Sequence, residues 1–145
     1  MAIVTFDTCI FISHQPTSFP KGFRMSAVVL QELTAGAPDD QIVKVWREVW
    51  KEHEKAGTLL VPNGEDWWLA GKVLNSLLRG LKARNKGRTP KLSGDEVHRI
   101  VRDVLIARTA KRAGAAVVTD NLKDFDKIKK YCSIRTLGPE RFLGK

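Results

Sequence analysis

The stretch Ala2-Ile3-Val4-Thr5-Phe6-Asp7-Thr8 decides the fold class of this chain. Ala2 to Phe6 has the length, the apolar character and the β-branched bias of a buried strand, and the strand ends at Asp7. The same pattern returns near the other end of the chain, where Ala115-Ala116-Val117-Val118-Thr119 runs into Asp120. In open α/β sheets, ligands bind outside the carboxyl ends of the strands. We therefore expect the two strand-end carboxylates to share one acidic pocket.

The chain between and after these strands alternates helical and extended patterns. Ser26 is suited to cap a helix, and Gly36, Gly57 and Gly114 stand where helical patterns end. Strands that alternate with helices favour a three-layer α/β/α fold, with a mainly parallel central sheet flanked by helices, in a single domain over residues 1–145. Helices are expected over residues 8–14, 27–35, 39–56, about 65–82 and 95–113, strands over 23–25, 58–61 and 133–136, and a turn or short helix over 121–126.

The charge balance indicates a polyanionic partner. The 145 residues contain 25 Lys and Arg against 16 Asp and Glu, a net charge of +9. Nucleic acid is the partner that this excess favours, and a merely soluble basic surface is the alternative. No stretch approaches the roughly 18 apolar residues of a membrane span, and the N-terminus lacks the pattern of an export signal. We therefore expect a cytoplasmic protein without membrane contact, in which Cys9 and Cys132 remain reduced.

A segment over residues 79–91 concentrates positive charge. It contains no acid and is interrupted by Gly80, Gly87 and Pro90, a composition that predicts a loop unable to pack on itself. The segment is either a solvated linker or a flexible arm that contacts phosphates. We favour the arm, because the segment leads directly into the helix that carries Asp103. The candidate RNA-binding residues are Arg79, Lys82, Arg84, Lys86, Arg88 and Lys91.

Aromatic residues mark the two middle helices. Trp46 and Trp50 lie in the helix expected over 39–56, and Trp67 and Trp68 in the helix expected over 65–82. Their helical spacing favours contact with the core or with a second copy of the chain over base stacking, and it places Trp67 on an apolar side. His53 continues the apolar stripe of the first helix, so we expect a packed histidine and not a metal ligand.

Four carboxylates are candidates for one site. Asp7 and Asp120 follow strands, whereas Glu32 and Asp103 interrupt mostly apolar helices. Two such anions about 4 Å apart repel by about 4 kcal/mol at an effective dielectric constant of about 20. Clustered acids therefore share protons or bind a hard divalent cation, and ligation by oxygen alone favours Mg²⁺ or Mn²⁺. Together with a basic surface, such a cluster suits metal-dependent hydrolysis of phosphodiester bonds.

Four short motifs carry a resemblance to a known family. They are Asp7-Thr8-Cys9, the stretch Ser26-Ala27-Val28-Val29-Leu30-Gln31-Glu32-Leu33, Asp103-Val104-Leu105-Ile106-Ala107, and Val117-Val118-Thr119-Asp120-Asn121-Leu122-Lys123-Asp124-Phe125. In this order and spacing the motifs resemble those of PIN-domain ribonucleases. The length of the chain and its last motif are most similar to VapC-type toxins of toxin–antitoxin pairs.

The resemblance implies a PIN-like fold, a metal-dependent endoribonuclease and a set of site residues. Asp7, Glu32, Asp103 and Asp120 would be the catalytic acids that bind Mg²⁺ or Mn²⁺. Asp124 is either a fifth acid of the site or a helix cap. The resemblance further implies an RNA substrate, a homodimer and a small cognate antitoxin that covers the active site. Its implied site neighbours, which orient water or phosphate, are Thr8, Thr119 and Asn121.

Other functions remain open at the level of the sequence. A PIN-type nuclease that matures RNA or cuts structured DNA would need no antitoxin. An RNA-binding scaffold with the same fold would need no intact acids, so the presence of all four argues against it. A phosphoaspartate domain is a more distant alternative, because the phosphate-binding lysine that it requires is not evident at a strand end.

Overall fold

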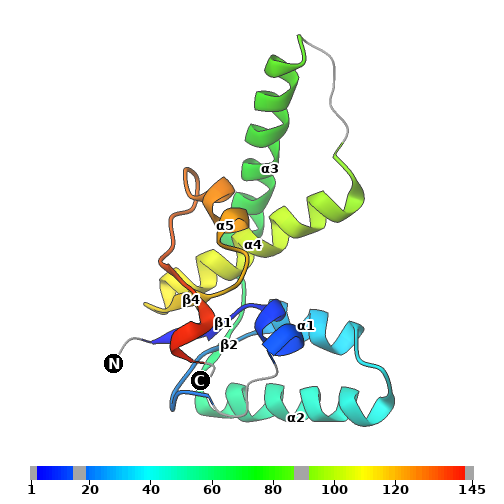
Figure 1. The fold of residues 1–145 in the computed structure, drawn as a ribbon, viewed down its shortest axis with the longest axis vertical. Helices are drawn as coiled ribbons and strands as arrows, with labels where there is room; N and C mark the ends of the chain where they lie inside the picture. Colours follow the sequence, from blue (N-terminus) through cyan, green and yellow to red (C-terminus); the bar gives the residue numbers. More distant parts are fainter. Residues whose placement is uncertain (1–2, 15–18, 87–91, 143–145) are drawn as a thin grey trace.

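A computed structural model describes residues 3–14, 19–86 and 92–142 of the chain (Figure 1). Most of the expected elements are present, and the strands are shorter than the apolar runs that contain them. The strands are β1 (Val4–Phe6), β2 (Met25–Ser26), β3 (Leu59–Leu60), β4 (Ala116–Val118) and β5 (Thr136–Leu137). The helices are α1 (Ala27–Ala35), α2 (Asp40–Ala56), α3 (Gly64–Arg84), α4 (Gly94–Arg112) and α5 (Leu122–Ile128), with a π-helix at Ile10–His14 and a 3-10 helix at Pro139–Arg141.

The strands are parallel, as the alternation of strands and helices predicts. Strand β4 lies between β1 and β5, and β2 pairs with β3. A parallel bridge between Thr5 and Arg24 joins the two groups, so the strands follow the order β3-β2-β1-β4-β5. Phe6 of β1 stands opposite Val118 of β4, so these neighbouring strands end side by side. The register therefore brings Asp7 and Thr119 to the same edge of the sheet.

Each face of the sheet has its own core because strand side chains alternate between the faces. Val117 packs with buried residues of α1, α3, α4 and α5. Ala116 and Val118 point the other way and pack with Val4, Phe6 and Ile10. Aromatic rings complete this second core, and the rings of Phe6 and Phe19 lie 5.2 Å apart. A sheet covered on both faces confirms the expected layered α/β architecture and leaves the strand ends for a site.

Helix α2 closes the aromatic core from outside. Its Trp46 ring contacts Phe11, with centroids 5.9 Å apart, and its His53 ring contacts Phe23 at 4.9 Å. The His53 Nδ1 atom lies 2.7 Å from the Thr58 hydroxyl. These contacts confirm the prediction that His53 packs against its neighbours.

Helix α1 has the predicted limits because its first residues are capped from the preceding strand. The Ser26 hydroxyl accepts a hydrogen bond from the Val29 amide at 3.3 Å, and the helix ends before Gly36. The cap belongs to β2, so the start of α1 is tied to the sheet. This attachment sets the position of Glu32, which lies at the sixth residue of the helix.

The basic segment is more helical than predicted. Helix α3 continues to Arg84, so Arg79, Lys82 and Arg84 lie on its last turns, and the loop expected from residue 79 onward is wrong in this part. Lys and Arg are good helix formers, and their charges are favourable near a helix C-terminus. Lys86 lies in the turn after the helix, and Arg88 and Lys91 fall outside the described residues.

The placement of Trp67 on a buried apolar side is wrong. The Trp67 and Trp68 side chains are 56% and 65% exposed, whereas the buried stripe of α3 runs through Asp66, Ala70 and Val73. Val73, also predicted on the apolar side, is buried as expected. At the start of the helix Asp66 takes the buried position instead of Trp67, and it is paired there with two arginines of α4. Contact of these tryptophans with a second copy of the chain remains a prediction.

The last strand begins later than predicted. Strand β5 is Thr136–Leu137, and only the Arg135 carbonyl extends its pairing, by accepting a hydrogen bond from the Val117 amide. Its register is set by β4, whose final residue Val118 pairs with Leu137.

None of the described helices combines the length and the apolar character that a membrane crossing demands.

Candidate active site at the strand ends

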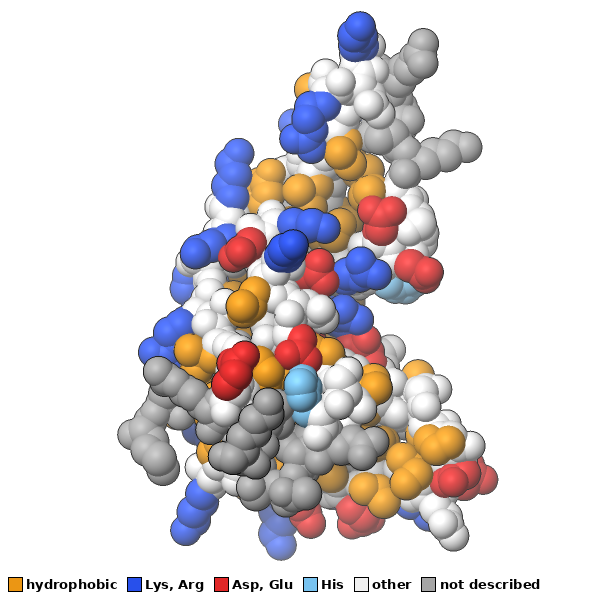
Figure 2. Space-filling model, viewed as in Figure 1, with side chains coloured by type: hydrophobic (Ala, Val, Ile, Leu, Met, Phe, Trp, Pro, Cys, Tyr) orange, Lys and Arg blue, Asp and Glu red, His pale blue; other side chains and the backbone are white. Residues whose placement is uncertain are grey.

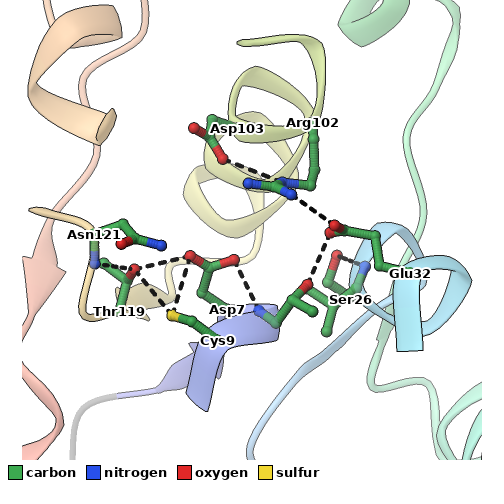
Figure 3. Close-up of polar contacts among 10 residues, drawn as sticks. Asp7, Cys9, Ser26, Glu32, Arg102, Asp103, Thr119 and Asn121 are labelled. Atoms are coloured by element: carbon green, nitrogen blue, oxygen red, sulfur yellow. Dashed lines mark hydrogen bonds and ion pairs between the residues drawn. The ribbon is translucent and has the colours of Figure 1, made fainter. Parts of the chain in front are cut away.

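Asp7 is held rigidly at the end of β1 (Figure 3). Its side chain is 2% exposed. Its Oδ1 atom accepts a hydrogen bond from the Thr8 amide at 2.8 Å, and its Oδ2 atom accepts one from the Thr119 hydroxyl, also at 2.8 Å. The Asp7 amide in turn donates to the Val118 carbonyl at 2.9 Å. Both strand ends thus orient one carboxylate, and the contact from the second strand end comes from Thr119 and not from the predicted Asp120.

Glu32 reaches the same place from α1. The Thr8 hydroxyl donates a hydrogen bond to Glu32 Oε1 at 2.8 Å. Since Thr8 also donates its amide to Asp7, one threonine contacts both carboxylates. The structure therefore brings together the predicted acids Asp7 and Glu32 and the predicted neighbours Thr8 and Thr119.

Asp103 approaches from α4 and is 3% exposed. Burial raises the pKa of Asp103 to about 7; the adjacent Arg102 opposes this shift, and the charges of Asp7 and Asp124 add to it. The carboxyl therefore gives up its proton less readily than an ordinary aspartate does. A carboxyl whose ionised form is disfavoured is expected in a metal site that holds clustered acids and no cation.

Arg102 lies between two of the predicted acids. Its Nη1 atom donates a hydrogen bond to Glu32 Oε2 at 2.6 Å, and its Nε atom lies 3.5 Å from Asp103 Oδ1. Figure 3 shows the guanidinium group between the Asp103 and Glu32 carboxylates. A positive side chain thus bridges carboxylates that would otherwise repel each other.

Asp120 occupies the outer edge of the site. It is exposed and lies 2.5 Å from the Nε2 atom of His14, at the end of the π-helix. Cys9 lies deeper, with its Sγ atom 3.7 Å from Asp7 Oδ2 and from the Thr119 hydroxyl. Burial and the Asp7 charge raise the pKa of the Cys9 thiol, which therefore stays protonated and is a poor nucleophile.

The two remaining predicted neighbours follow Asp120. The Asn121 amide donates to the Thr119 hydroxyl at 2.9 Å, whereas the Asn121 side chain makes no capping hydrogen bond. Asp124 lies in the first turn of α5, 3.9 Å from Lys127. It lines a cavity together with Asp103, so its carboxylate adjoins the acid cluster.

The donor set fits a hard divalent cation in its chemistry. The predicted ligands are carboxylates, which Mg²⁺ and Mn²⁺ favour, and a guanidinium already compensates the charge of two of them. In their present positions, no three His, Cys, Asp or Glu side chains among residues 3–14, 19–86 and 92–142 are close enough to hold one ion. The assignment of Asp7, Glu32, Asp103 and Asp120 as metal ligands therefore remains a prediction.

Two contacts of the acids were missed by reasoning from sequence. His14 was assigned to the end of a short helix, and nothing in the sequence links it to Asp120, which is 106 residues away. Arg102 offered a weak signal, since a basic residue directly before a half-buried acid is suited to neutralise it. Its bond to Glu32 depends on how α4 packs against α1.

A groove adjoins the acid cluster on the side of the long helices. It is a cavity of about 340 Å³ between α3, α4 and α5, and we call it the helical groove. Figure 2 shows hydrophobic side chains in this upper part of the molecule, bordered by Lys and Arg. The residues that line the helical groove include Leu77, Leu81, Arg84, Ile100, Asp103, Asp124 and Ile128.

Comparisons with known proteins identify the fold. No protein-family model and no curated protein matches the chain. A chain in the structure of VapBC-1 from nontypeable Haemophilus influenzae matches with a TM-score of 0.53 and 21% identity, over 94% of this chain and 97% of that one. A chain in the structure of DNA-bound VapBC from Salmonella typhimurium matches with a TM-score of 0.51 and 22% identity, over 95% and 98% of the respective chains. This protein therefore has the fold of those VapBC chains, a PIN-like α/β fold with a parallel sheet flanked by helices.

Proposed function

We propose that this protein is a divalent-metal-dependent endoribonuclease and the toxin of a toxin–antitoxin pair. The observation that carries the proposal is the convergence of Asp7, Glu32 and Asp103 at the sheet edge, where a guanidinium bridges two of them. The net charge of +9 favours a nucleic-acid substrate. The fold shared with chains of VapBC complexes favours a role beside an antitoxin, and we propose a cytoplasmic location for the pair.

The chain's own residues have distinct roles in this proposal. Asp7, Glu32, Asp103 and Asp120 would hold Mg²⁺ or Mn²⁺. When bound, such a metal neutralises the scissile phosphate and lowers the pKa of an attacking water. Thr8 and Thr119 fix the Asp7 carboxylate through hydrogen bonds of 2.8 Å and thereby set the orientation in which it would meet a metal. Asp124 adjoins Asp103 and is suited to position water beside the cluster.

A panel of folded RNAs and DNA hairpins of matched sequence tests the substrate class. With Mg²⁺ present, the protein should cut one or more RNAs at internal positions and leave the DNA intact. Cleavage of DNA alone would favour a nuclease for structured DNA. RNA binding without cleavage under any divalent metal would favour a scaffold and would contradict the proposed enzyme.

The basic residues at the end of α3 are proposed to contact RNA phosphates. Arg84 is exposed and also lines the helical groove, which leads to Asp103. Arg84→Ala should weaken RNA binding and reduce the slope of log K against log salt by about 0.7–0.9, the value for one lost phosphate contact. Filter binding across a salt series measures this slope.

Arg47→Ala is the matched control, since Arg47 is an exposed arginine on α2 and is not part of the basic segment. Its salt slope should equal that of the wild type. Equal slopes for Arg84→Ala and the wild type would show that this part of the segment is a solvated surface.

The antitoxin is proposed to cover the acid cluster from the helical groove. The groove has an apolar lining suited to the side chains of a bound segment, and it ends at Asp103 and Asp124. If a short reading frame beside the gene encodes a protein that binds this one and stops cleavage, the toxin hypothesis is favoured over that of an RNA-maturation nuclease.

We further propose a homodimer, for which exposed Trp67 and Trp68 are candidate contacts.

A further inference from the structure

Arg102 makes unusual contacts for a side chain inside a predicted metal site. It belongs to α4, is 25% exposed, and bridges Glu32 of α1 and Asp103 of its own helix (Figure 3). Burial would lower the pKa of Arg102, but the charges of Asp103 and Glu32 outweigh it, so the guanidinium stays charged. The positive charge that the acid cluster requires is thus supplied by the chain itself.

The guanidinium is only partly satisfied in this position. Nη1 donates one hydrogen bond, to Glu32 Oε2, whereas Nε is buried and has no hydrogen-bond partner among the described residues. A buried donor without a partner is unfavourable, because it has lost its hydrogen bonds to water without replacing them. The Asp66 carboxylate is a contrasting case in the same protein, because its hydrogen-bonding capacity is filled. It accepts hydrogen bonds from Arg108, Arg112 and the Asn63 amide. The bridge of Arg102 is therefore incomplete by comparison.

We propose that Arg102 is a built-in counter-cation that competes with the divalent metal for Glu32 and Asp103. The inference rests on the proposed function, in which both acids are metal ligands. The guanidinium already lies at Glu32 Oε2 and Asp103 Oδ1. A divalent cation at the same carboxylates would be repelled by this charge. Arg102 thus holds the metal-free site together and weakens metal binding until it turns away.

Titration of metal-free protein with Mn²⁺ tests this competition independently of cleavage. Calorimetry gives the dissociation constant, and thermal melting with and without Mn²⁺ gives the stability. Arg102→Gln removes the charge but keeps a polar side chain of similar reach. It should bind Mn²⁺ at least about tenfold more tightly, a change of about 1.4 kcal/mol. Its metal-free form should melt at a lower temperature, and Mn²⁺ should raise its melting temperature more than that of the wild type.

Two further variants make the comparison specific. Arg47→Gln removes an exposed arginine of α2, away from the acid cluster and the helical groove, and should leave the dissociation constant unchanged. Arg102→Lys keeps the charge that the metal-free acids need for folding, and its affinity should lie between those of the wild type and Arg102→Gln. This variant keeps the comparison informative if Arg102→Gln does not fold without metal.

The outcomes separate this inference from the proposed function. Equal or weaker Mn²⁺ binding by Arg102→Gln would overturn the competition, even if the wild type cuts RNA with metal. Absence of binding in both proteins would overturn it as well, because removal of Arg102 should expose the site. Tighter binding by Arg102→Gln would uphold the competition even if the RNA panel is not cut.

Discussion

Asp7→Asn is expected to abolish metal-dependent RNA cleavage and to leave the fold intact. The substitution removes a charge from the centre of the acid cluster and so weakens metal binding. Because a metal lowers the activation free energy of hydrolysis by several kcal/mol, the cleavage rate should fall at least about a hundredfold. Asparagine has the shape of aspartate and can still accept the Thr8 amide hydrogen bond. It also relieves the repulsion that Asp7 exerts on Asp103. The free energy of unfolding should therefore change by less than about 1 kcal/mol.

Cleavage rates and thermal melting of the two proteins, measured side by side, check this prediction. Asp126→Asn is the control, since Asp126 is an exposed acid on α5 that the site does not include, and its rate should match the wild type. An Asp7→Asn protein that cuts RNA as fast as the wild type would remove Asp7 from the catalytic residues. An unfolded variant would show instead that the carboxylate charge holds the strand ends together.

Among the substitutions proposed for this chain, Asp66→Asn is expected to cause the largest decrease in the free energy of unfolding, although Asp66 has no role in the proposed chemistry. Asp66 is fully buried at the start of α3. Its carboxylate accepts hydrogen bonds from the Asn63 amide at 2.9 Å, from Arg108 at 3.2 Å and from Arg112. Loss of the charge leaves two arginines without their anion and weakens the capping box, at a cost of about 3 kcal/mol. Glu65→Gln, at an exposed neighbour, should cost less than about 0.5 kcal/mol.

The effect of Asp66→Asn should also depend on pH. Burial alone would raise the pKa of Asp66, but its bonds to Arg112, Asn63 and Arg108 hold that pKa below the ordinary value of 3.8. A carboxyl with a lowered folded-state pKa stabilises the fold above its unfolded-state pKa, and this stabilisation is lost as the pH falls through the folded-state value. Denaturant melts should therefore show the full difference from the wild type at pH 6 and a smaller one below pH 3.8. A difference that stays constant in acid would contradict the ionic role of Asp66.

Elements with strong local signals could be predicted from the sequence. The limits of α1 follow from the Ser26 cap and Gly36, and the meeting of Asp7 with Thr119 follows from two apolar runs that end in polar residues. These features depend on neighbours in the chain and on the general rule that parallel strands end at one edge. Asp7 is found from the strand pattern in this way, whereas Glu32 stands out as the acid in a mostly apolar helix, and the catalytic role of both stays a prediction.

Features that depend on packing between distant elements could not be predicted. The Arg102–Glu32 bond joins residues 70 apart in sequence, and it exists only because α4 crosses α1. The buried side of α3 was misplaced for a related reason. Periodicity favours the apolar Trp67, whereas the structure buries the charged Asp66, which two arginines of α4 neutralise. Sequence patterns record hydrophobicity and miss charges whose partners lie on another helix.

We propose that the carboxylate cluster acts on RNA through a divalent metal. The most direct test is to strip the wild-type protein with EDTA, remove the chelator, and follow cleavage of one susceptible RNA before and after Mg²⁺ or Mn²⁺ is restored. We predict no cutting by the stripped protein and recovery with either metal. Cutting that continues at the same rate in excess EDTA would contradict the account, because the four acids would then need another role.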